Sequence, residues 1–216
     1  MTSEPAEPIR LDQQQALRTA AEWLVEEFGA LFGVETIERF LFSSYDEFAE
    51  HARFTHFLPL IAQRFARQRL RALAMVQGHG DGRPAVLFLC THNAARSQMA
   101  LGFFRHHARD RAIAWSGGTH PSDSVDLSAV SAMAERGVDI AGEYAKPWTD
   151  EIVRAANVVI TMGCGDACPV YAGTHYEEWV LDDPEGEGVE TVRTVRDEIE
   201  RRVLVLLDDL GLHPNG

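Results

Sequence analysis

The residues from Cys90 to Ser97 bring a thiol, an amide, a guanidinium and two hydroxyls together within one short segment. They follow the apolar run 85–89 and precede a helix-like segment, which places them in a loop between a strand and a helix. Such a loop binds an oxyanion, because its backbone N–H groups point inward, the fork of Arg96 takes two anion oxygens, and the helix N-terminus adds positive charge. The same field favours the thiolate of Cys90, which predicts a nucleophile beside the oxyanion site. The predicted oxyanion-binding residues are Thr91, His92, Asn93, Ala94, Ala95, Arg96 and Ser97.

The two other cysteines, Cys164 and Cys168, follow a second apolar run at 157–162. Cysteines four positions apart can form a disulfide if the segment is helical or looped. The alternative is half of a zinc site, which Cys90 and a histidine such as His175 would have to complete, and we predict no metal site. Three cysteines are an odd number, which favours reactive thiols over a structural disulfide framework. For Cys90 the alternative is an unreactive cysteine that ends a core strand.

A pair of carboxylates, Asp182-Asp183, follows the apolar run 177–181 and precedes Pro184. A carboxylic acid beside a bound oxyanion is a natural proton donor to a departing oxygen. By itself Asp-Pro is an ordinary turn, so the interest of the pair comes from its place after a predicted strand.

The elements that must position these residues alternate between strand and helix after residue 84. We expect strands at 85–89, 112–116, 157–162 and 177–181, and helices at 97–109, 126–136, 149–156 and 189–210. This pattern predicts an α/β fold with a four-stranded parallel sheet flanked by helices. Ligands of such sheets bind beyond the carboxyl ends of the strands, where Cys90, Cys164 and Asp183 would all lie.

The first part of the chain has a different sequence pattern. Residues 1–9 are a loose leader, and helical periodicity without strand signals then predicts a small three-helix bundle. The glycine-rich segment 78–84 is a linker. We therefore expect two domains, a helical bundle at 1–80 and a catalytic domain at 81–216.

The charge of the chain limits its partners. Its 33 acidic and 20 basic residues give a formal net charge of −13, which argues against nucleic acid or an anionic membrane as a partner. No apolar run approaches the ~20 residues of a membrane span and no signal peptide begins the chain, so we expect a cytoplasmic protein. Lys146 is the single lysine, a bias that indicates genomic base composition.

Residues 81–216 resemble the thioredoxin-coupled arsenate reductases of the low-molecular-weight tyrosine phosphatase superfamily. The residues before 80 resemble the helical N-terminal extension of actinobacterial-type members. The segments that carry the resemblance are Val86–Ala100, Ser116–Thr119, Ile160–Pro169, Trp179–Pro184 and Arg193–Ile199.

The resemblance implies a role for each matching residue. Cys90 would be the attacking thiolate and Asp183 the acid, and Cys164 and Cys168 would form a redox relay. Asn93, Arg96 and Ser97 would shape and charge the loop. The chain departs from the family at Ala95, where many members have a second cysteine, and in a shorter relay spacing. It also has Leu101 where relatives with a potassium site have a glutamate, so no potassium is predicted.

Our hypothesis is that the protein reduces arsenate to arsenite through the three cysteines and holds no bound cofactor. Thioredoxin, with thioredoxin reductase and NADPH, would then return the cysteines to their thiol form. The resemblance implies arsenate as substrate, with phosphate or sulfate as competing oxyanions, and a homodimer through the bundle is a further expectation. Two alternatives stay open. A phosphatase needs no second thiol, and a metalloid or redox sensor binds without turnover.

Overall fold

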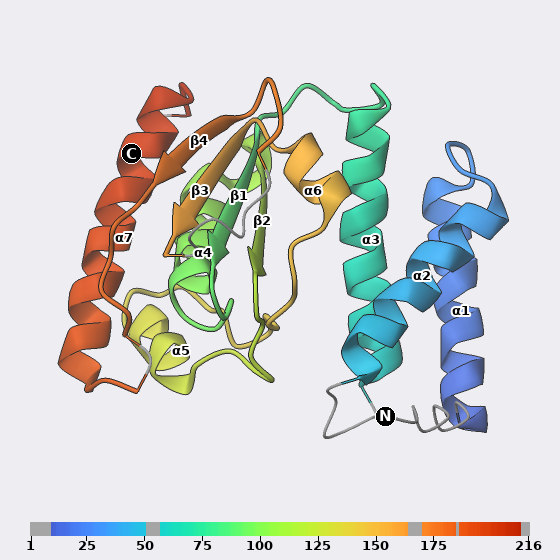
Figure 1. Ribbon diagram of the computed structural model, residues 1–216, viewed down its shortest axis with the longest axis horizontal. Coiled ribbons are helices and arrows are strands. Elements are labelled where there is room, and N and C mark those ends of the chain that lie inside the picture. The colour runs from blue at the N-terminus through green and yellow to red at the C-terminus, as the bar shows by residue number, and fades with distance from the viewer. Residues whose placement is uncertain (1–9, 51–56, 164–169, 185, 213–216) are drawn as a thin grey trace. The chain divides into compact units, whose positions relative to one another are not determined.

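A computed structural model describes residues 10–50, 57–163, 170–184 and 186–212 of the chain (Figure 1). The chain divides into two compact units, Met1–Ala74 and Met75–Gly216. The division falls inside a helix, a few residues before the expected boundary at 80. No helix among the described residues is long and apolar enough to cross a membrane.

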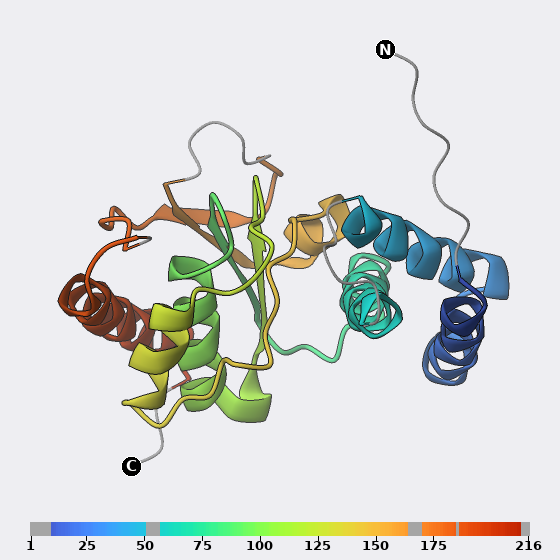
Figure 2. The same ribbon diagram turned by 90° about the horizontal axis from the view of Figure 1, so that it is seen from below.

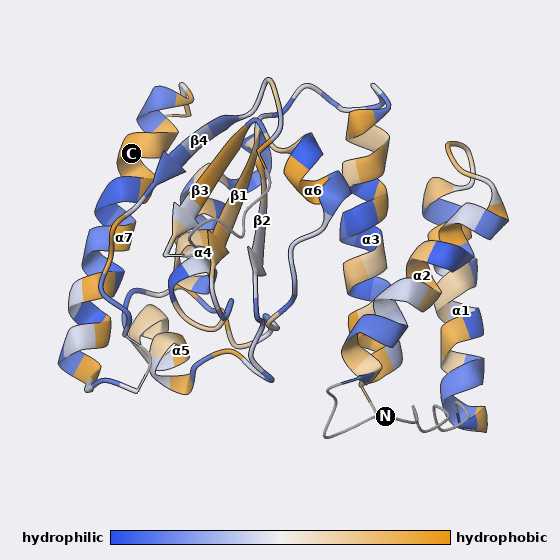
Figure 3. Cartoon of the chain, in the orientation of Figure 1, coloured by the Kyte–Doolittle hydropathy of each residue, from blue (hydrophilic) through white to orange (hydrophobic). Residues whose placement is uncertain are grey.

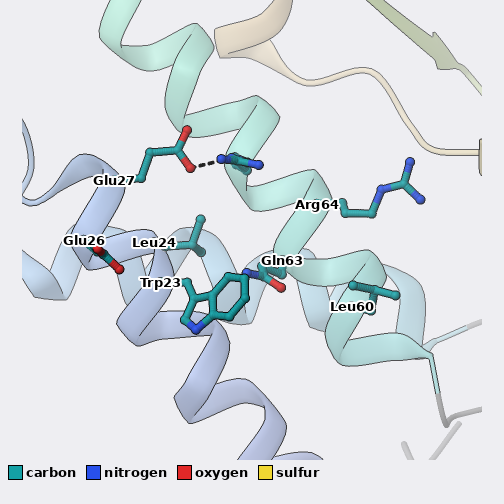
Figure 4. A pocket seen from close by; sticks show the side chains of 8 residues that line it. Trp23, Leu24, Glu26, Glu27, Leu60, Gln63 and Arg64 are labelled. Carbon is teal, nitrogen blue, oxygen red and sulfur yellow. Dashed lines mark hydrogen bonds and ion pairs between the residues drawn. The ribbon is translucent and has the colours of Figure 1, made fainter.

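The first unit consists of the three expected helices, α1 (Leu11–Phe28), α2 (Val34–Ala49) and α3 (Leu58–Val76). Apolar side chains at helical spacing bury one face of each helix in a common core. The buried residues with the largest side chains include Leu17, Leu24, Phe28, Ile37, Leu41 and Leu70. A groove of about 420 Å³ is lined by residues of α1 and α3, with Trp23 and Leu60 among them (Figure 4).

The second unit is built on a sheet of four parallel strands in the order β2-β1-β3-β4 (Figure 1). The strands are β1 (Ala85–Cys90), β2 (Ile113–Gly118), β3 (Val158–Met162) and β4 (His175–Glu178). The parallel sheet confirms the predicted fold class. Its register pairs Cys90 with Gly118 and with Met162, so the ends of the three neighbouring strands meet at one edge.

Three helices pack on one face of the sheet. They are α4 (Arg96–Ala108), α5 (Leu127–Ala134) and α7 (Val189–Asp209), and they enclose the main core of the unit. A shorter helix, α6 (Asp150–Ala155), lies on the opposite side of the sheet (Figure 2). A 3₁₀ turn at Arg109–Arg111 connects α4 to β2.

The hydropathy of the strands follows their positions in the sheet. The inner strands β1 and β3 are hydrophobic, whereas the edge strand β4 is hydrophilic (Figure 3). The predicted strand 177–181 is wrong in its bounds, because β4 begins at His175 and ends at Glu178. The backbone N–H of Trp179 still donates to the carbonyl of Thr161. β3 then ends at Met162, so within the described residues no strand lies beside the chain after Trp179. Asp182 and Asp183 therefore lie in a loop after the sheet rather than at a strand end.

Phe88 offers a test of this core, because its fully buried ring packs against Phe104 and Trp179 at centroid distances of 5.7 and 6.0 Å. Phe88→Ala should reduce the free energy of unfolding by about 3–5 kcal/mol through lost contacts and a cavity. Urea unfolding followed by tryptophan fluorescence measures the loss. The control Val180→Ala removes an exposed side chain and should change stability by less than about 0.5 kcal/mol. Equal effects of the two substitutions would contradict the assigned core.

Candidate active site

The loop between β1 and α4 turns its carbonyl groups away from its own centre. Each carbonyl oxygen from Cys90 to Ala95 accepts a hydrogen bond from outside this segment. Four of the donors are backbone N–H groups of the chain that leaves β2, namely Thr119 to Cys90, His120 to Thr91, Ser122 to His92 and Asp126 to Ala94, at 2.8–3.3 Å. The other two are Gln98 Nε2 to Asn93, at 3.1 Å, and the N–H of Met99 to Ala95, at 2.9 Å. With its acceptors occupied outside, the loop is free to direct N–H donors inward, as oxyanion binding requires.

The sulfur of Cys90 lies among donors at the end of β1. The backbone N–H of Asn93 donates to Cys90 Sγ at 3.2 Å, and Ser97 Oγ lies 3.0 Å from the same atom. Asn93 Nδ2 in turn donates to Ser97 Oγ at 2.7 Å, which leaves the serine hydroxyl proton to point at the sulfur. Hydrogen bonds of this kind stabilise a thiolate, because they donate to its negative charge.

Asn93 holds the loop in its shape from within. Its φ of 49° lies in the left-handed region, which asparagine adopts more readily than most residues. Its side-chain Oδ1 accepts hydrogen bonds from Gln98 Nε2 and from the backbone N–H of Lys146, both at 3.0 Å. Asn93 is fully buried, so these bonds replace water and make one conformation dominant.

Two glycines let neighbouring strands approach the loop. A Cβ on Gly118, at the end of β2, would lie 2.7 Å from the carbonyl oxygen of Thr91 and 3.0 Å from the nitrogen of Asn93. Gly163, directly after β3, has a φ of 78° and accepts a hydrogen bond from Thr91 Oγ1 at 3.0 Å. A Cβ there would lie 3.2 Å from Arg96 Nη1, so the end of β3 touches the guanidinium of the loop.

Arg96 and Asp183 are brought together although 87 positions separate them. Arg96 Nη2 donates to Asp183 Oδ2 at 2.6 Å. The arginine side chain is buried and the aspartate is half exposed, so the carboxylate covers the guanidinium from the solvent side. The structure therefore places the predicted acid, Asp183, in contact with the predicted anion ligand, Arg96.

The structure thus brings together Cys90, the loop residues 91–97 and Asp183, and places them at the carboxyl edge of the sheet. Cys164 and Cys168 lie outside the described residues, and the zinc alternative that involves them stays untested. Among the described residues no three His, Cys, Asp or Glu side chains are grouped as metal ligands.

The sequence prediction did not include Gln98, Gly118 and the segment 119–126, which all support the loop. Gln98 is a polar residue among the apolar positions of a predicted helix, and a buried amide needs partners, which is the signal that could have indicated a role. Backbone donors such as Thr119 and Ser122 act through their N–H groups, which every residue except proline has, so their side chains give no signal.

Comparison with known proteins places the chain in a family. Residues 85–213 match the low molecular weight phosphotyrosine protein phosphatases, and residues 17–74 match the N-terminal domain described as protein-tyrosine-phosphatase-like. The chain belongs to the low molecular weight phosphotyrosine protein phosphatase family. This confirms the resemblance seen in the sequence, for the sheet domain and for the helical extension.

Several relatives have names that specify a reaction. The solved structure of a thioredoxin-dependent arsenate reductase from Corynebacterium glutamicum has 36% sequence identity and a TM-score of 0.83, and the match covers 93% of this chain and 98% of the relative. The glutaredoxin arsenate reductase of Synechocystis is 36% identical over 121 residues, which are 55% of this chain and 92% of the relative. The arsenate reductase of Shouchella clausii is 38% identical over 128 residues, 55% of this chain and 91% of the relative.

Gly118→Ala tests whether the approach of β2 shapes the loop. The added methyl group would overlap the backbone at Thr91 and Asn93, so we expect phosphate, as a probe anion, to protect Cys90 from alkylation at least about tenfold more weakly. Gly142→Ala is the matched control, because Gly142 has no neighbour within 4 Å of the added atom and should leave protection unchanged. Undiminished protection in Gly118→Ala would show that the loop does not depend on this contact.

Proposed function

We propose that this protein reduces arsenate to arsenite, with Cys90 as the nucleophile and Cys164 and Cys168 as the thiols that complete the reduction. The observation that carries the proposal is the loop of residues 90–97, whose outward carbonyls, buried arginine and hydrogen-bonded sulfur suit a tetrahedral oxyanion next to a nucleophile. The names of the relatives specify arsenate as that oxyanion.

The first step forms a bond between Cys90 Sγ and arsenic. The thiolate attacks the arsenic of a monoprotonated arsenate, and the hydroxyl group of the arsenate takes a proton from Asp183 and leaves as water. Arsenic is still in its +5 state in the thiol adduct. Arg96 and the loop N–H groups hold the remaining oxygens and stabilise the charge that develops on them.

The position of Asp183 supports this role. Its carboxylate pairs with Arg96 in the free site. An arsenate bound by the same guanidinium would therefore have an oxygen close to the carboxyl group of Asp183.

The reduction itself comes from the second thiol. Cys164 attacks Cys90 Sγ, the sulfur–arsenic bond breaks, and its electron pair stays on arsenic, which leaves as arsenite in the +3 state. Cys168 then attacks Cys164, which frees Cys90 and leaves a disulfide between Cys164 and Cys168. Support comes from the chain itself, because Gly163 lies against Arg96 and Cys164 is the next residue in the sequence.

An external dithiol must reduce this disulfide in each cycle. We propose thioredoxin, regenerated by thioredoxin reductase and NADPH, because the relative that matches almost the whole chain is thioredoxin-dependent. The Synechocystis relative is instead a glutaredoxin enzyme, so glutaredoxin with glutathione is the reductant to compare. NADPH consumption with arsenate, measured with each reductant in turn, distinguishes the two.

The family match keeps phosphatase activity as a second candidate, because Cys90, Arg96 and Asp183 would also serve phosphoryl transfer. A phosphatase hydrolyses an aryl phosphate without any reductant and keeps its rate when Cys164 or Cys168 is changed. A metalloid sensor would bind arsenite stoichiometrically and would not turn over. NADPH-coupled turnover with arsenate, and its absence without arsenate, excludes both alternatives.

Cys90→Ser should abolish arsenate reduction, because a hydroxyl at neutral pH does not replace a thiolate. The fold should remain, which circular dichroism and the unfolding midpoint can verify. Thioredoxin-coupled NADPH oxidation is the measurement. Turnover by the variant at a tenth of the wild-type rate or more would remove Cys90 from the mechanism.

Arg96→Lys retains the charge but loses the two-pronged hydrogen bonding of the guanidinium. We expect kcat/KM for arsenate to fall by an amount equivalent to about 2–4 kcal/mol of transition-state stabilisation. Arg201→Lys is the control, because Arg201 is exposed and pairs with Glu198 on α7. Equal kinetics of the two variants would show that Arg96 does not contact the substrate.

A further inference from the structure

The single lysine of the chain is completely buried. The chain has one lysine, Lys146, and 19 arginines, and the side chain of Lys146 has no exposed surface. Its Nζ donates to Ser116 Oγ at 3.1 Å and to the carbonyl oxygen of Tyr144 at 3.3 Å, and it lies 4.7 Å from the centre of the Tyr144 ring. Burial of an ammonium group costs free energy unless its protons have hydrogen-bond partners. The contacts of Lys146 therefore indicate that this position requires a lysine, which base composition does not explain.

A carboxylate completes the surroundings of this ammonium. Glu143 Oε2 is buried and accepts no hydrogen bond among the described residues, and it lies 3.9 Å from Lys146 Nζ. The other oxygen, Oε1, accepts a hydrogen bond from Arg105 Nη1 at 2.8 Å. Glu143 is therefore shared between an exposed arginine and the buried lysine.

The backbone of Lys146 links the end of β2 to the loop. Its carbonyl oxygen accepts the N–H of Gly118 at 2.9 Å, and its own N–H donates to Asn93 Oδ1 at 3.0 Å. Asn93 in turn donates to Ser97 Oγ and, through its N–H, to Cys90 Sγ. One residue, Asn93, thus connects Lys146 to the nucleophile.

We propose that Lys146 is a positioning residue for the oxyanion loop, and that its buried ammonium anchors the segment 144–148 to β2 so that Asn93 keeps the conformation that directs donors toward Cys90 and its anion. The proposal deepens the proposed function, since it concerns the same loop. Its chemistry applies to any tetrahedral oxyanion that the loop binds.

The neighbouring groups explain why this position holds lysine in an arginine-rich chain. An ammonium is a compact charge with three donors, and here it faces a hydroxyl, a carbonyl and a carboxylate. The planar guanidinium of arginine is larger and has a fixed fork of donors. It would have to displace the segment that carries the bond to Asn93.

The test uses the full chain with Cys164→Ser and Cys168→Ser, so that Cys90 is the only thiol. Iodoacetamide alkylation measures the reactivity of Cys90 as a function of pH, and protection by inorganic phosphate measures the affinity of the loop for an anion. Lys146→Met removes the ammonium but keeps most of the side-chain volume. Arg105→Met is the matched control, because it removes the exposed cation from the same carboxylate.

We expect Lys146→Met to weaken phosphate protection at least about tenfold, the range found when a group that orients a ligand-binding residue is removed. Alkylation of Cys90 should also change in rate, because Asn93 no longer holds its N–H against the sulfur. Arg105→Met should leave both measurements unchanged. Lys146→Met with a lower unfolding midpoint but wild-type protection and alkylation would overturn the proposal, because the lysine would then support the fold alone.

Chemical rescue gives a second measurement. Lys146→Ala leaves a cavity lined by Ser116, Tyr144 and Glu143, and an ammonium ion fits those acceptors. Ammonium chloride should restore phosphate protection in this variant, and sodium chloride at the same concentration should not. Equal effects of the two salts would contradict the role of a localised cation.

If neither substitution of Lys146 gives a folded protein, Ser116→Ala tests the role of the lysine instead. It keeps the lysine and removes one acceptor of the ammonium, so phosphate protection should weaken several-fold with the fold intact. Unchanged protection would overturn the proposal. These measurements need neither arsenate nor thioredoxin, so their failure is distinct from failure of the proposed reductase activity.

Discussion

The site depends on one constraint, which is that the loop after β1 must keep its carbonyl groups away from the anion. A peptide chain has as many acceptors as donors, and acceptors that faced the site would repel an oxyanion. Here the chain that leaves β2 and the first turn of α4 bind each carbonyl from Cys90 to Ala95. The register of the sheet makes this geometry available, because it aligns Cys90 with Gly118 and so starts the donor segment beside the loop.

Local geometry matters more in this protein than overall charge. The chain carries a formal net charge of −13, which repels anions at long range. The loop offers a buried arginine, the N-terminus of α4 and the N–H of Asn93, which donates to the sulfur of Cys90. Arg96 also pairs with Asp183, so the arginine predicted to bind the anion touches the carboxyl group predicted to donate a proton to it.

The sequence predicted the candidate reactive side chains of the site better than the residues that hold the loop in place. Cys90, Arg96 and Asp183 could be predicted as one site because their side chains carry reactive or charged groups and apolar runs precede Cys90 and Asp183, and the structure places Arg96 against Asp183. The end of β4 was misplaced, because Trp179, Val180 and Leu181 continue an apolar pattern after the pairing with β3 has stopped. Gly118 and the donors of segment 119–126 act through close approach and backbone N–H groups, which become visible only when the sheet register is known. Lys146 was attributed to base composition, and its burial could not be seen from one lysine in a polar segment.

The helical unit has a core of its own, and the match of residues 17–74 to an N-terminal domain shows that relatives share it. Cys90, Arg96 and Asp183 lie in the second unit, beside the carboxyl ends of its strands. The homodimer through this bundle stays a prediction.

The most direct test of the central claim is a single-turnover measurement with Cys168→Ser and Cys164→Ser proteins, reduced beforehand and freed of external thiol. The account predicts about one arsenite per Cys168→Ser molecule, with a disulfide between Cys90 and Cys164 found by peptide mapping, and no arsenite from Cys164→Ser, because nothing else attacks the Cys90 adduct. Stoichiometric arsenite from Cys164→Ser, or sustained thioredoxin-coupled turnover by Cys168→Ser, would contradict the three-cysteine relay.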